Sequence, residues 1–191
     1  MTGANTTTIG TPGTGDKRVM GLAVAPGTRT VWWAQYTPGP AINWARTDGS
    51  ARGTLDTTGA TVNAPLAIAI SHRSGRAYWS SFWNIGSASL SGGAGFDIAT
   101  AMRPGGVAID DSAGHLYRME APSQLVSIKR TDLDGQGVVS VAPSGLPSGG
   151  VTALALLFPP VQASAPAITG TATVGSALTC AGATWAADTP E

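Results

Sequence analysis

The chain has 191 residues, of which 42% are hydrophobic and 12% charged, and its formal net charge at pH 7 is zero. An apolar fraction of this size permits a buried core and argues against an intrinsically disordered chain. Because no basic field is present to attract phosphate groups or anionic lipids, we expect neither nucleic acid nor membrane insertion. The 26 Gly and 13 Pro residues indicate many tight turns, as an all-β protein with short strands requires.

Targeting and redox signals are sparse. Residues 1–8 have neither a basic nor an apolar segment and do not form a signal peptide. The longest apolar run, residues 151–161, is far shorter than the ~20 residues that a membrane-spanning helix needs. Cys180 is the single cysteine, so no intrachain disulfide is expected. A lone thiol is more typical of a small buried hydrophobic residue than of a nucleophile.

An apolar strand followed by an aromatic strand occurs three times along the chain. The apolar strand combines small and branched residues, and a turn that contains Gly or Arg leads to the aromatic strand. In both strands the three copies are separated by 46 and then 39 positions. The members are Leu22, Ile68 and Val107 in the apolar strand and Trp32, Tyr78 and Tyr117 in the aromatic strand.

A second landmark repeats independently of the first. Ile42, Ile85 and Ile128 begin a third strand and lie 43 positions apart. The Asp-Gly pairs at 48–49 and 134–135 predict type I′ hairpins, in which both central residues have positive φ. A period near 43 lies in the ~40–50-residue range of propeller blades. No window has sustained helical spacing, so each unit predicts a four-stranded antiparallel meander.

The predicted fold class is therefore all-β, with about three to four four-stranded meanders that form a partial ring of β-propeller blades over residues 1–158. The predicted blades span about residues 18–60, 63–101 and 104–148. Two further segments have blade patterns without the rest of a blade. Residues 5–10 are typical of a last strand, and residues 151–157 repeat the apolar first strand, with Leu154 lying 47 positions after Val107.

The C-terminal part has a different pattern. Residues 159–166 are rich in Pro and Ala and predict a linker. In residues 167–191, Gly170 and Gly175 precede a Leu-Thr strand and the Gly-x-x-Trp sequence at 182–185, which resembles the opening of a bacterial Ig-like repeat. We expect a short, truncated Ig-like β segment here, and a fragment of a longer multi-module protein. A ring completed by a second chain and an eroded propeller are the alternatives.

The blade motifs resemble a known type of repeat. They consist of Gly-Leu-Ala-Val at 21–24, Val-Trp-Trp at 31–33, Ala-Tyr-Trp at 77–79 and Ile-x-x-Ala-x-x-Asp-Gly-Ser at 42–50. Over residues 5–158 these motifs resemble the YWTD (LDL-receptor class B) and NHL-type repeats of six-bladed β-propellers. The tetrapeptide of the first family is degenerate in all three blades.

The resemblance implies a non-enzymatic binding or interaction propeller module of a secreted or cell-surface bacterial protein. YWTD-type repeats typically bind other proteins, and Ig-like arrays act as stalks. We therefore expect an extracellular or cell-surface location, a protein or glycan ligand, no cofactor, and self-association through open blade edges.

The alternatives to a binding module are a propeller enzyme of the metal-dependent lactonase or lyase type and a structural spacer. In such enzymes several blades supply inward-facing carboxylates to a metal. Here the inner strands offer Ala, Leu, Ile and Val, with Asp110 nearly alone. For this reason we favour a protein without catalytic activity, and no catalytic, cofactor-binding or metal-binding residue is assigned.

Five residues are candidates for ligand contact. His72, Asp110, Asp111 and His115 lie in or beside the turns between the first and second strands of successive blades. Such turns gather at one end of a propeller, where these side chains could bind a cation or act as acid and base. The competing interpretation is ordinary polar turn residues, because Asp readily hydrogen-bonds its own backbone. Trp83 lies in a loop between the second and third strands, and an aromatic side chain in a loop is suited to ligand contact.

Overall fold

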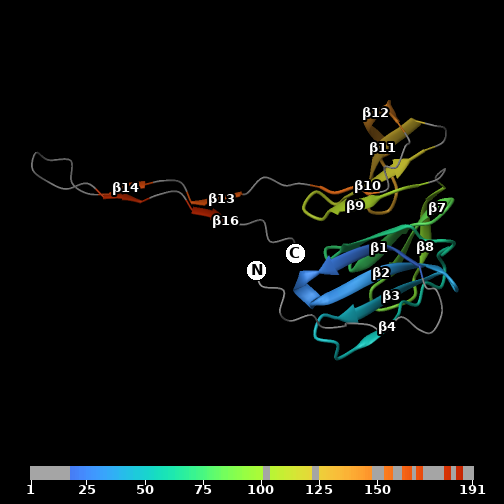
Figure 1. Ribbon diagram of the computed structural model, residues 1–191. Coiled ribbons are helices and arrows are strands. Elements are labelled where there is room, and N and C mark those ends of the chain that lie inside the picture. The colour runs from blue at the N-terminus through green and yellow to red at the C-terminus, as the bar shows by residue number, and fades with distance from the viewer. Residues whose placement is uncertain are drawn as a thin grey trace, which may run out of the picture. The chain divides into compact units, whose positions relative to one another are not determined.

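The computed structural model shows an all-β chain and confirms the predicted fold class (Figure 1). The structure describes residues 18–100, 104–121, 125–147, 153–156, 161–164, 167–169, 179–181 and 184–186. In these ranges no helix has the length and apolar character needed to cross a membrane. The chain divides into two compact units, with the boundary between Leu156 and Leu157.

The described residues of the first unit form three four-stranded antiparallel sheets, each a meander in chain order. Blade 1 consists of β1 (Arg18–Ala25), β2 (Thr30–Thr37), β3 (Ala41–Arg46) and β4 (Arg52–Thr54), with the 3-10 turn η1 (Pro26–Thr28) after β1. Blade 2 consists of β5 (Ala67–Ser71), β6 (Arg76–Ser80), β7 (Asn84–Ser89) and β8 (Phe96–Thr100). Blade 3 consists of β9 (Val107–Asp110), β10 (His115–Glu120), β11 (Leu125–Asp132) and β12 (Val139–Pro147). All three lie within the ranges that the sequence predicts.

The first strands β1, β5 and β9 lie side by side, and glycine permits their close approach. A Cβ on Gly21 would come within 2.7 Å of the Ala67 Cα in the next blade. Likewise, a Cβ on Gly106 would come within 2.8 Å of the Ala153 carbonyl carbon. Residues 153–156, from the predicted first strand at 151–157, form no assigned strand but lie beside blade 3 as β5 lies beside blade 1. The segment predicted at 5–10 lies outside the described residues.

One hydrophobic cluster fills the space between blades 1 and 2. Trp32 and Ile42 of blade 1 pack in the same cluster as Ile68 and Trp79 of blade 2. Trp79 is fully buried, and its indole lies over Gly86, where a Cβ would come within 2.6 Å of the ring. Its Nε1 donates to the Thr61 carbonyl at 3.0 Å, so the polar atom of the ring is satisfied. Loss of a buried aromatic side chain of this size costs about 3–5 kcal/mol.

A second cluster joins blades 2 and 3. It consists of Tyr78 and Ile85 from one blade and Val107 and Leu116 from the other. Successive residues of a strand point to opposite faces, so Tyr78 faces blade 3 while its neighbour Trp79 faces blade 1. The aromatic pair of the repeated motif therefore serves two interfaces at once.

The hairpins at the Asp-Gly pairs differ from the predicted type I′ turns. Gly49 and Gly135 have φ of 74° and 90°, but Asp48 and Asp134 are not among the residues with positive φ. The backbone N of Gly49 donates to the Arg46 carbonyl at 3.0 Å, and only the glycine then enters the left-handed region. The hydrogen bonds from Arg46 N to the Ala51 carbonyl and from Asp132 N to the Gln136 carbonyl enclose residues 47–50 and 133–135. Both loops are therefore longer than a two-residue hairpin, and the aspartate does not need a positive φ.

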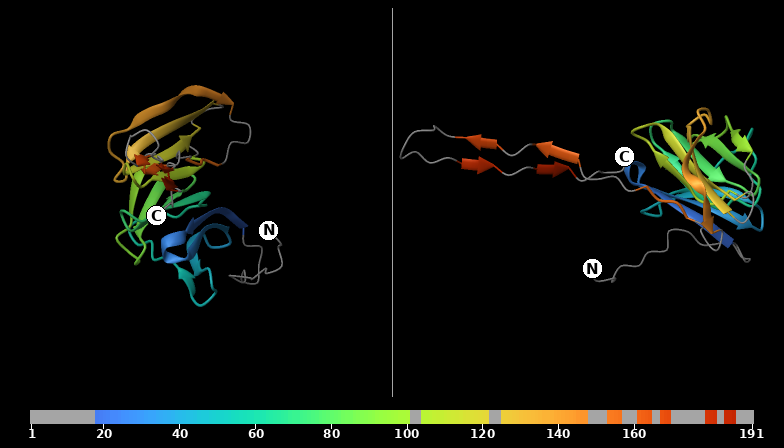
Figure 2. Two further views of the ribbon diagram at one scale, coloured as in Figure 1. Left: turned by 90° about the vertical axis from the view of Figure 1, so that its left-hand side faces the viewer. Right: turned by 90° about the horizontal axis from the view of Figure 1, so that it is seen from above.

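The second unit, residues 157–190, contains two antiparallel strand pairs, which Figure 2 shows as a ribbon. The strands are β13 (Val161–Ser164), β14 (Ala167–Thr169), β15 (Thr179–Ala181) and β16 (Thr184–Ala186). β13 pairs with β16, and β14 pairs with β15. β13 lies inside the predicted linker at 159–166. Its four residues lack proline, so their backbone donors are free to pair.

Candidate functional site

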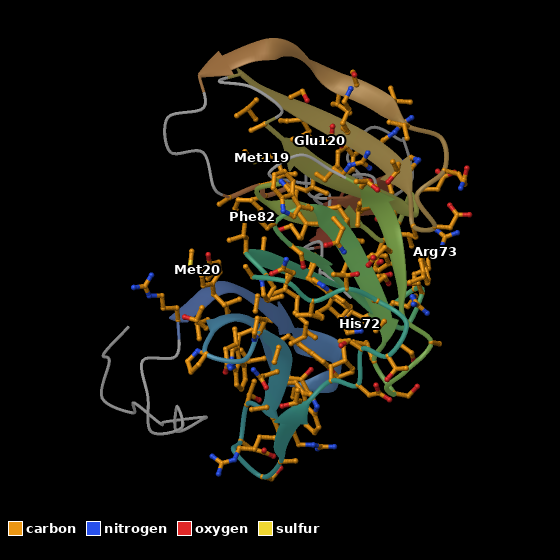
Figure 3. All side chains as sticks on the ribbon, turned by 90° about the vertical axis from the view of Figure 1, so that its right-hand side faces the viewer. Met20, His72, Arg73, Phe82, Met119 and Glu120 are labelled. Atoms are coloured by element: carbon orange, nitrogen blue, oxygen red, sulfur yellow. The ribbon has the colours of Figure 1, made fainter. Side chains whose placement is uncertain are left out.

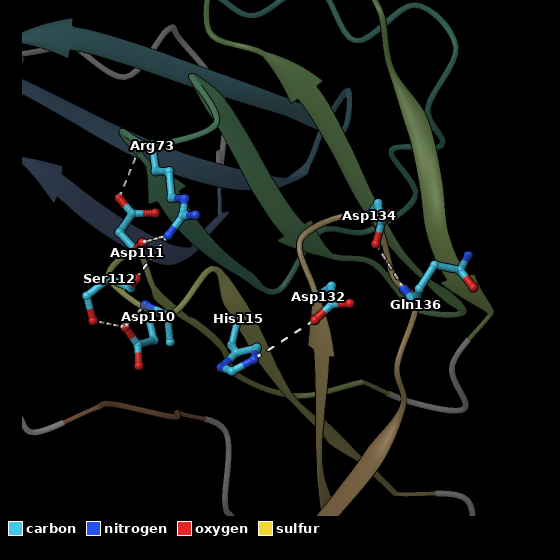
Figure 4. A network of polar contacts seen from close by, with 9 residues as sticks. Arg73, Asp110, Asp111, Ser112, His115, Asp132, Asp134 and Gln136 are labelled. Carbon is cyan, nitrogen blue, oxygen red and sulfur yellow. Dashed lines mark hydrogen bonds and ion pairs between the residues drawn. The ribbon is translucent and has the colours of Figure 1, made fainter.

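The turn between β9 and β10 positions the predicted acidic residues (Figure 4). Asp110 Oδ1 accepts hydrogen bonds from Ser112 Oγ at 2.6 Å and from the backbone N of Ala113 at 2.9 Å. Partial burial acts to raise the pKa of Asp110, but these hydrogen bonds and the neighbouring His115 outweigh it and hold the pKa below its ordinary value. The carboxylate of Asp110 thus caps its own turn.

Asp111 connects this turn to blade 2. Its Oδ2 accepts from the backbone N of His72 at 2.7 Å and from that of Arg73 at 3.4 Å. In return, Arg73 Nη1 donates to the carbonyl oxygens of Asp111 at 3.3 Å and Ser112 at 2.9 Å. The two turns are therefore fastened to each other, and the predicted approach of these residues is found.

The two imidazole rings at this end point to different neighbours. The His115 Nε2 lies 3.9 Å from Asp132 Oδ1, and the ring meets Tyr117 edge-on. His72 uses its backbone for Asp111, while its Cε1 lies 3.9 Å from where a Cβ on Gly27 would be. Among the described residues, no group of three or more His, Cys, Asp or Glu could hold a metal ion.

The opposite end of the blades carries exposed aromatic side chains. Residues 81–83, which we call the aromatic loop, connect β6 to β7. Phe82 and Trp83 contact each other edge to face with ring centroids 4.7 Å apart. They remain 38% and 50% exposed, although rings of this size are usually largely covered. An aromatic pair in this position presents a contiguous apolar surface to solvent.

Backbone hydrogen bonds fix the aromatic loop to the body of blade 2. The N of Ser81 donates to the Asn84 carbonyl at 2.8 Å, and the N of Phe82 donates to the Asn63 carbonyl at 3.1 Å. Ser81 itself is fully buried, and its Oγ accepts from the N of Asn63 at 3.3 Å. Because both ends of this short loop are bonded, little conformational entropy remains to be lost when a partner binds.

Residues of both flanking blades lie at this end of the molecule. In the view of Figure 3, Phe82 lies between Met20 of blade 1 and Glu120 of blade 3, on the side away from His72 and Arg73. Met20 is 53% exposed and adds apolar surface. The Glu120 carboxylate accepts from the buried Arg118 Nε at 2.7 Å, so its charge is balanced within the protein.

Sequence reasoning identified Trp83 but not Phe82. The signal available was adjacency, because two consecutive aromatic residues in a loop of three residues cannot both point inward. Neither Met20 nor Glu120 had a signal of its own. Both lie at the same end of the blades as Phe82, because the stacking of blades gathers residues that are distant in the sequence.

Comparisons with known proteins identify the fold. The chain matches the solved structure of a nidogen/laminin complex with 23% sequence identity and a TM-score of 0.60, over 66% of this chain and 48% of that chain. It matches a putative TolB from Agrobacterium tumefaciens with 13% identity and a TM-score of 0.51, over 68% and 50%. The chain thus spans about half the length of these structures. The likeness supports β-propeller blades.

Neither of the sequence comparisons gives a match. No protein-family model matches the chain, and no curated protein matches it. The coarse class of β-propeller therefore rests on the structure, while the YWTD, NHL and Ig-like assignments stay proposals from the sequence.

Proposed function

We propose that this chain is a non-enzymatic binding module that takes a protein ligand through the aromatic loop and the surface around it. The observation that carries the proposal is the exposed, edge-to-face pair of Phe82 and Trp83 on a loop whose backbone is hydrogen-bonded at Ser81 and Phe82. Interfaces draw most of their energy from a few aromatic and arginine side chains near the centre. A rigid pair of rings meets this requirement at low entropic cost.

The electrostatics of the chain agree with a contact of this kind. The net charge is zero, and Glu120, which lies at this end of the blades, is already paired with Arg118. An apolar contact with few unpaired charges does not need long-range attraction, so we expect partner binding to depend weakly on salt. The same surface would bind a polyanion poorly.

The similarity to a nidogen/laminin complex adds support at the level of fold, since that structure is a complex of two proteins. By this analogy, the chain belongs to a secreted or cell-surface protein. From the sequence resemblance alone, residues 167–191 are the proposed Ig-like segment. YWTD-type repeats are the proposed repeat family. Glycans are a second class of ligand that exposed aromatic rings bind, and the experiment below distinguishes glycan binding from protein binding.

The proposal is tested by capture followed by titration. The immobilised full chain is exposed to secreted and surface proteins from the source organism's culture, and retained proteins are identified by mass spectrometry. The dissociation constant of each purified partner is then measured for the wild type, Trp83→Ala and the control Val138→Ala, which removes another exposed apolar side chain. A protein that binds the wild type and the control but not Trp83→Ala supports the proposal. Binding of glycans alone, or equal binding by all three chains, contradicts it.

A further inference from the structure

One face of blade 1 is apolar and exposed. Along β1 the side chains alternate, so that Ala23 and Ala25 turn toward blade 2 and the residues between them turn away. On the far side Met20, Leu22 and Val24 are 53%, 62% and 56% exposed. A row of three large apolar residues on one strand is unusual for a free surface.

In blades 2 and 3, the first-strand residues at the position of Leu22 are covered by the preceding blade. Leu22 pairs with Trp33 across β1 and β2, just as Ile68 pairs with Trp79 in blade 2. Ile68 and Val107, at the positions of Leu22, are each 5% exposed because the preceding blade packs on them. Trp79 is buried in the same way. The row of Leu22 is thus a blade-stacking face, and no blade covers it among the described residues.

Blade 3 carries the matching face. In blades 1 and 2, Trp32 and Tyr78 face the following blade and are 5% and 0% exposed. Tyr117 of blade 3 takes the same position, paired with Ala108 and Arg130, and is partly exposed. The side of blade 3 that carries Tyr117 and points away from blade 2, here called its distal face, therefore corresponds to the surfaces that pack against the next blade within the chain. We expect it to pack against the face of blade 1 that carries Leu22 and Val24.

We propose that a second copy of this chain covers the free face of blade 1, with the distal face of blade 3 in one copy stacking on blade 1 of the other. Such a dimer has two junctions, each between blade 3 of one copy and blade 1 of the other, and a two-fold axis relates them. Each junction repeats the blade-to-blade packing already present within the chain. The three blades match about half the length of two solved β-propeller structures, so further blades fit beside both stacking faces. A closed ring leaves no apolar stacking face in solvent.

Residues 153–156 compete with this arrangement. They lie beside Gly106 of blade 3, just as β5 lies beside Gly21 of blade 1. In the proposed ring, β1 of the second copy takes this position beside Gly106. The segment contains Leu154 and covers part of the distal face of blade 3 in the single chain. Ring closure therefore displaces residues 153–156, and the strength of their contact sets the dissociation constant of the dimer.

The test is the mass of the full chain in solution, measured by sedimentation equilibrium over about a hundredfold range of concentration. The wild type is expected to form a species of twice 19.1 kDa. Leu22→Asp should raise the dimer dissociation constant by about 30-fold or more, because a carboxylate would be buried at the junction. Val24→Lys is a second variant of the same face, and far-UV circular dichroism confirms that both remain folded. Leu154→Asp should tighten the dimer.

Two control variants separate this proposal from others. Val138→Asp, at a residue 57% exposed and on neither stacking face, should leave the dimer unchanged. Trp83→Ala should also leave it unchanged, so that failure of ligand binding and failure of dimer formation are distinct results. A wild type of 19.1 kDa at every concentration overturns the proposal. So does a dimer that persists in Leu22→Asp, a dimer that Leu154→Asp does not tighten, or an assembly that grows beyond two copies.

Discussion

The two ends of the blades use their chemically distinctive residues in opposite ways. At the end formed by the turns after β5 and β9, the carboxylates of Asp110 and Asp111 accept hydrogen bonds from their own turn and from the neighbouring blade. At the other end, hydrogen bonds engage the backbone of the aromatic loop and leave the rings of Phe82 and Trp83 exposed. Side chains that hold blades together have less capacity to hold a ligand, whereas a loop held by its backbone keeps its side chains free.

The largest expected effect is on partner binding at the aromatic end. Trp83→Ala should weaken binding by about 2–4 kcal/mol, the range of an interface hot spot, which corresponds to roughly 30- to 1000-fold. Stability should change little, because the ring is half exposed. Isothermal titration and chemical denaturation measure the two quantities, with Val138→Ala as the control. A comparable loss of binding in the control would remove the distinction between the ends.

The next effect is on stability at the polar end. Asp111→Ala removes the acceptor for the backbone donors of His72 and Arg73 and should lower the free energy of unfolding by about 1–2 kcal/mol. Partner binding should remain as in the wild type. Asp134→Ala is the matched control, because Asp134 accepts a hydrogen bond from Gln136 within its own turn. If Asp111→Ala abolished ligand binding while the fold stayed stable, the polar end would be the site.

A smaller effect is expected where the aromatic loop joins blade 2. Ser81→Ala leaves the backbone N of Asn63 without its partner at 3.3 Å and should cost about 0.5–1 kcal/mol of stability. The looser loop should also weaken partner binding by about threefold, because more entropy is lost on association. Ser91→Ala, in the exposed turn after β7, serves as control. Unchanged binding in Ser81→Ala would show that the rigidity of the loop is unimportant.

The smallest effect is a pH dependence at Asp110. Its pKa in the folded chain lies below the ordinary value of 3.8, so the unfolded chain binds more protons in this range and stability falls as the pH drops through the folded pKa. Asp110→Asn should be less stable than the wild type at neutral pH and should approach it at acidic pH. The difference is small because solvent screens the exposed carboxylate. Denaturation curves at several pH values measure it, and a gap that widens on acidification would contradict the assignment.

The repeat period of the sequence was sufficient to predict the blades but not to predict how deeply each of their side chains is buried. Trp33 and Trp79 occupy equivalent positions of the repeat, so the sequence pattern alone does not distinguish them. Trp79 is fully buried between two blades, whereas Trp33 is only partly buried because it faces away from blade 2. Local pattern determines the strand and the direction of a side chain. Burial depends on which sheet packs against it, which a repeat pattern does not state.

The candidate site shows the same division. The turns that contain His72 and Asp111 lie together, because turns of one kind gather at one end of stacked meanders, whereas the carboxylate of Asp110 accepts hydrogen bonds from its own turn. The hydrogen bonds from the backbone of His72 and Arg73 to Asp111 could not be predicted, since they depend on the offset between blades. Trp83 was predicted from its loop, but its contact with Phe82 and the position of Met20 required the three-dimensional arrangement.

The most direct measurement compares the two ends with two double variants of the full chain. The dissociation constant of the captured protein partner is measured for Phe82→Ala/Trp83→Ala and for Asp110→Asn/Asp111→Asn under identical conditions. We expect the aromatic double variant to lose binding by about a hundredfold or more, and the carboxylate double variant to bind as the wild type does. Loss of binding in the carboxylate variant, with binding retained in the aromatic variant, would contradict the account.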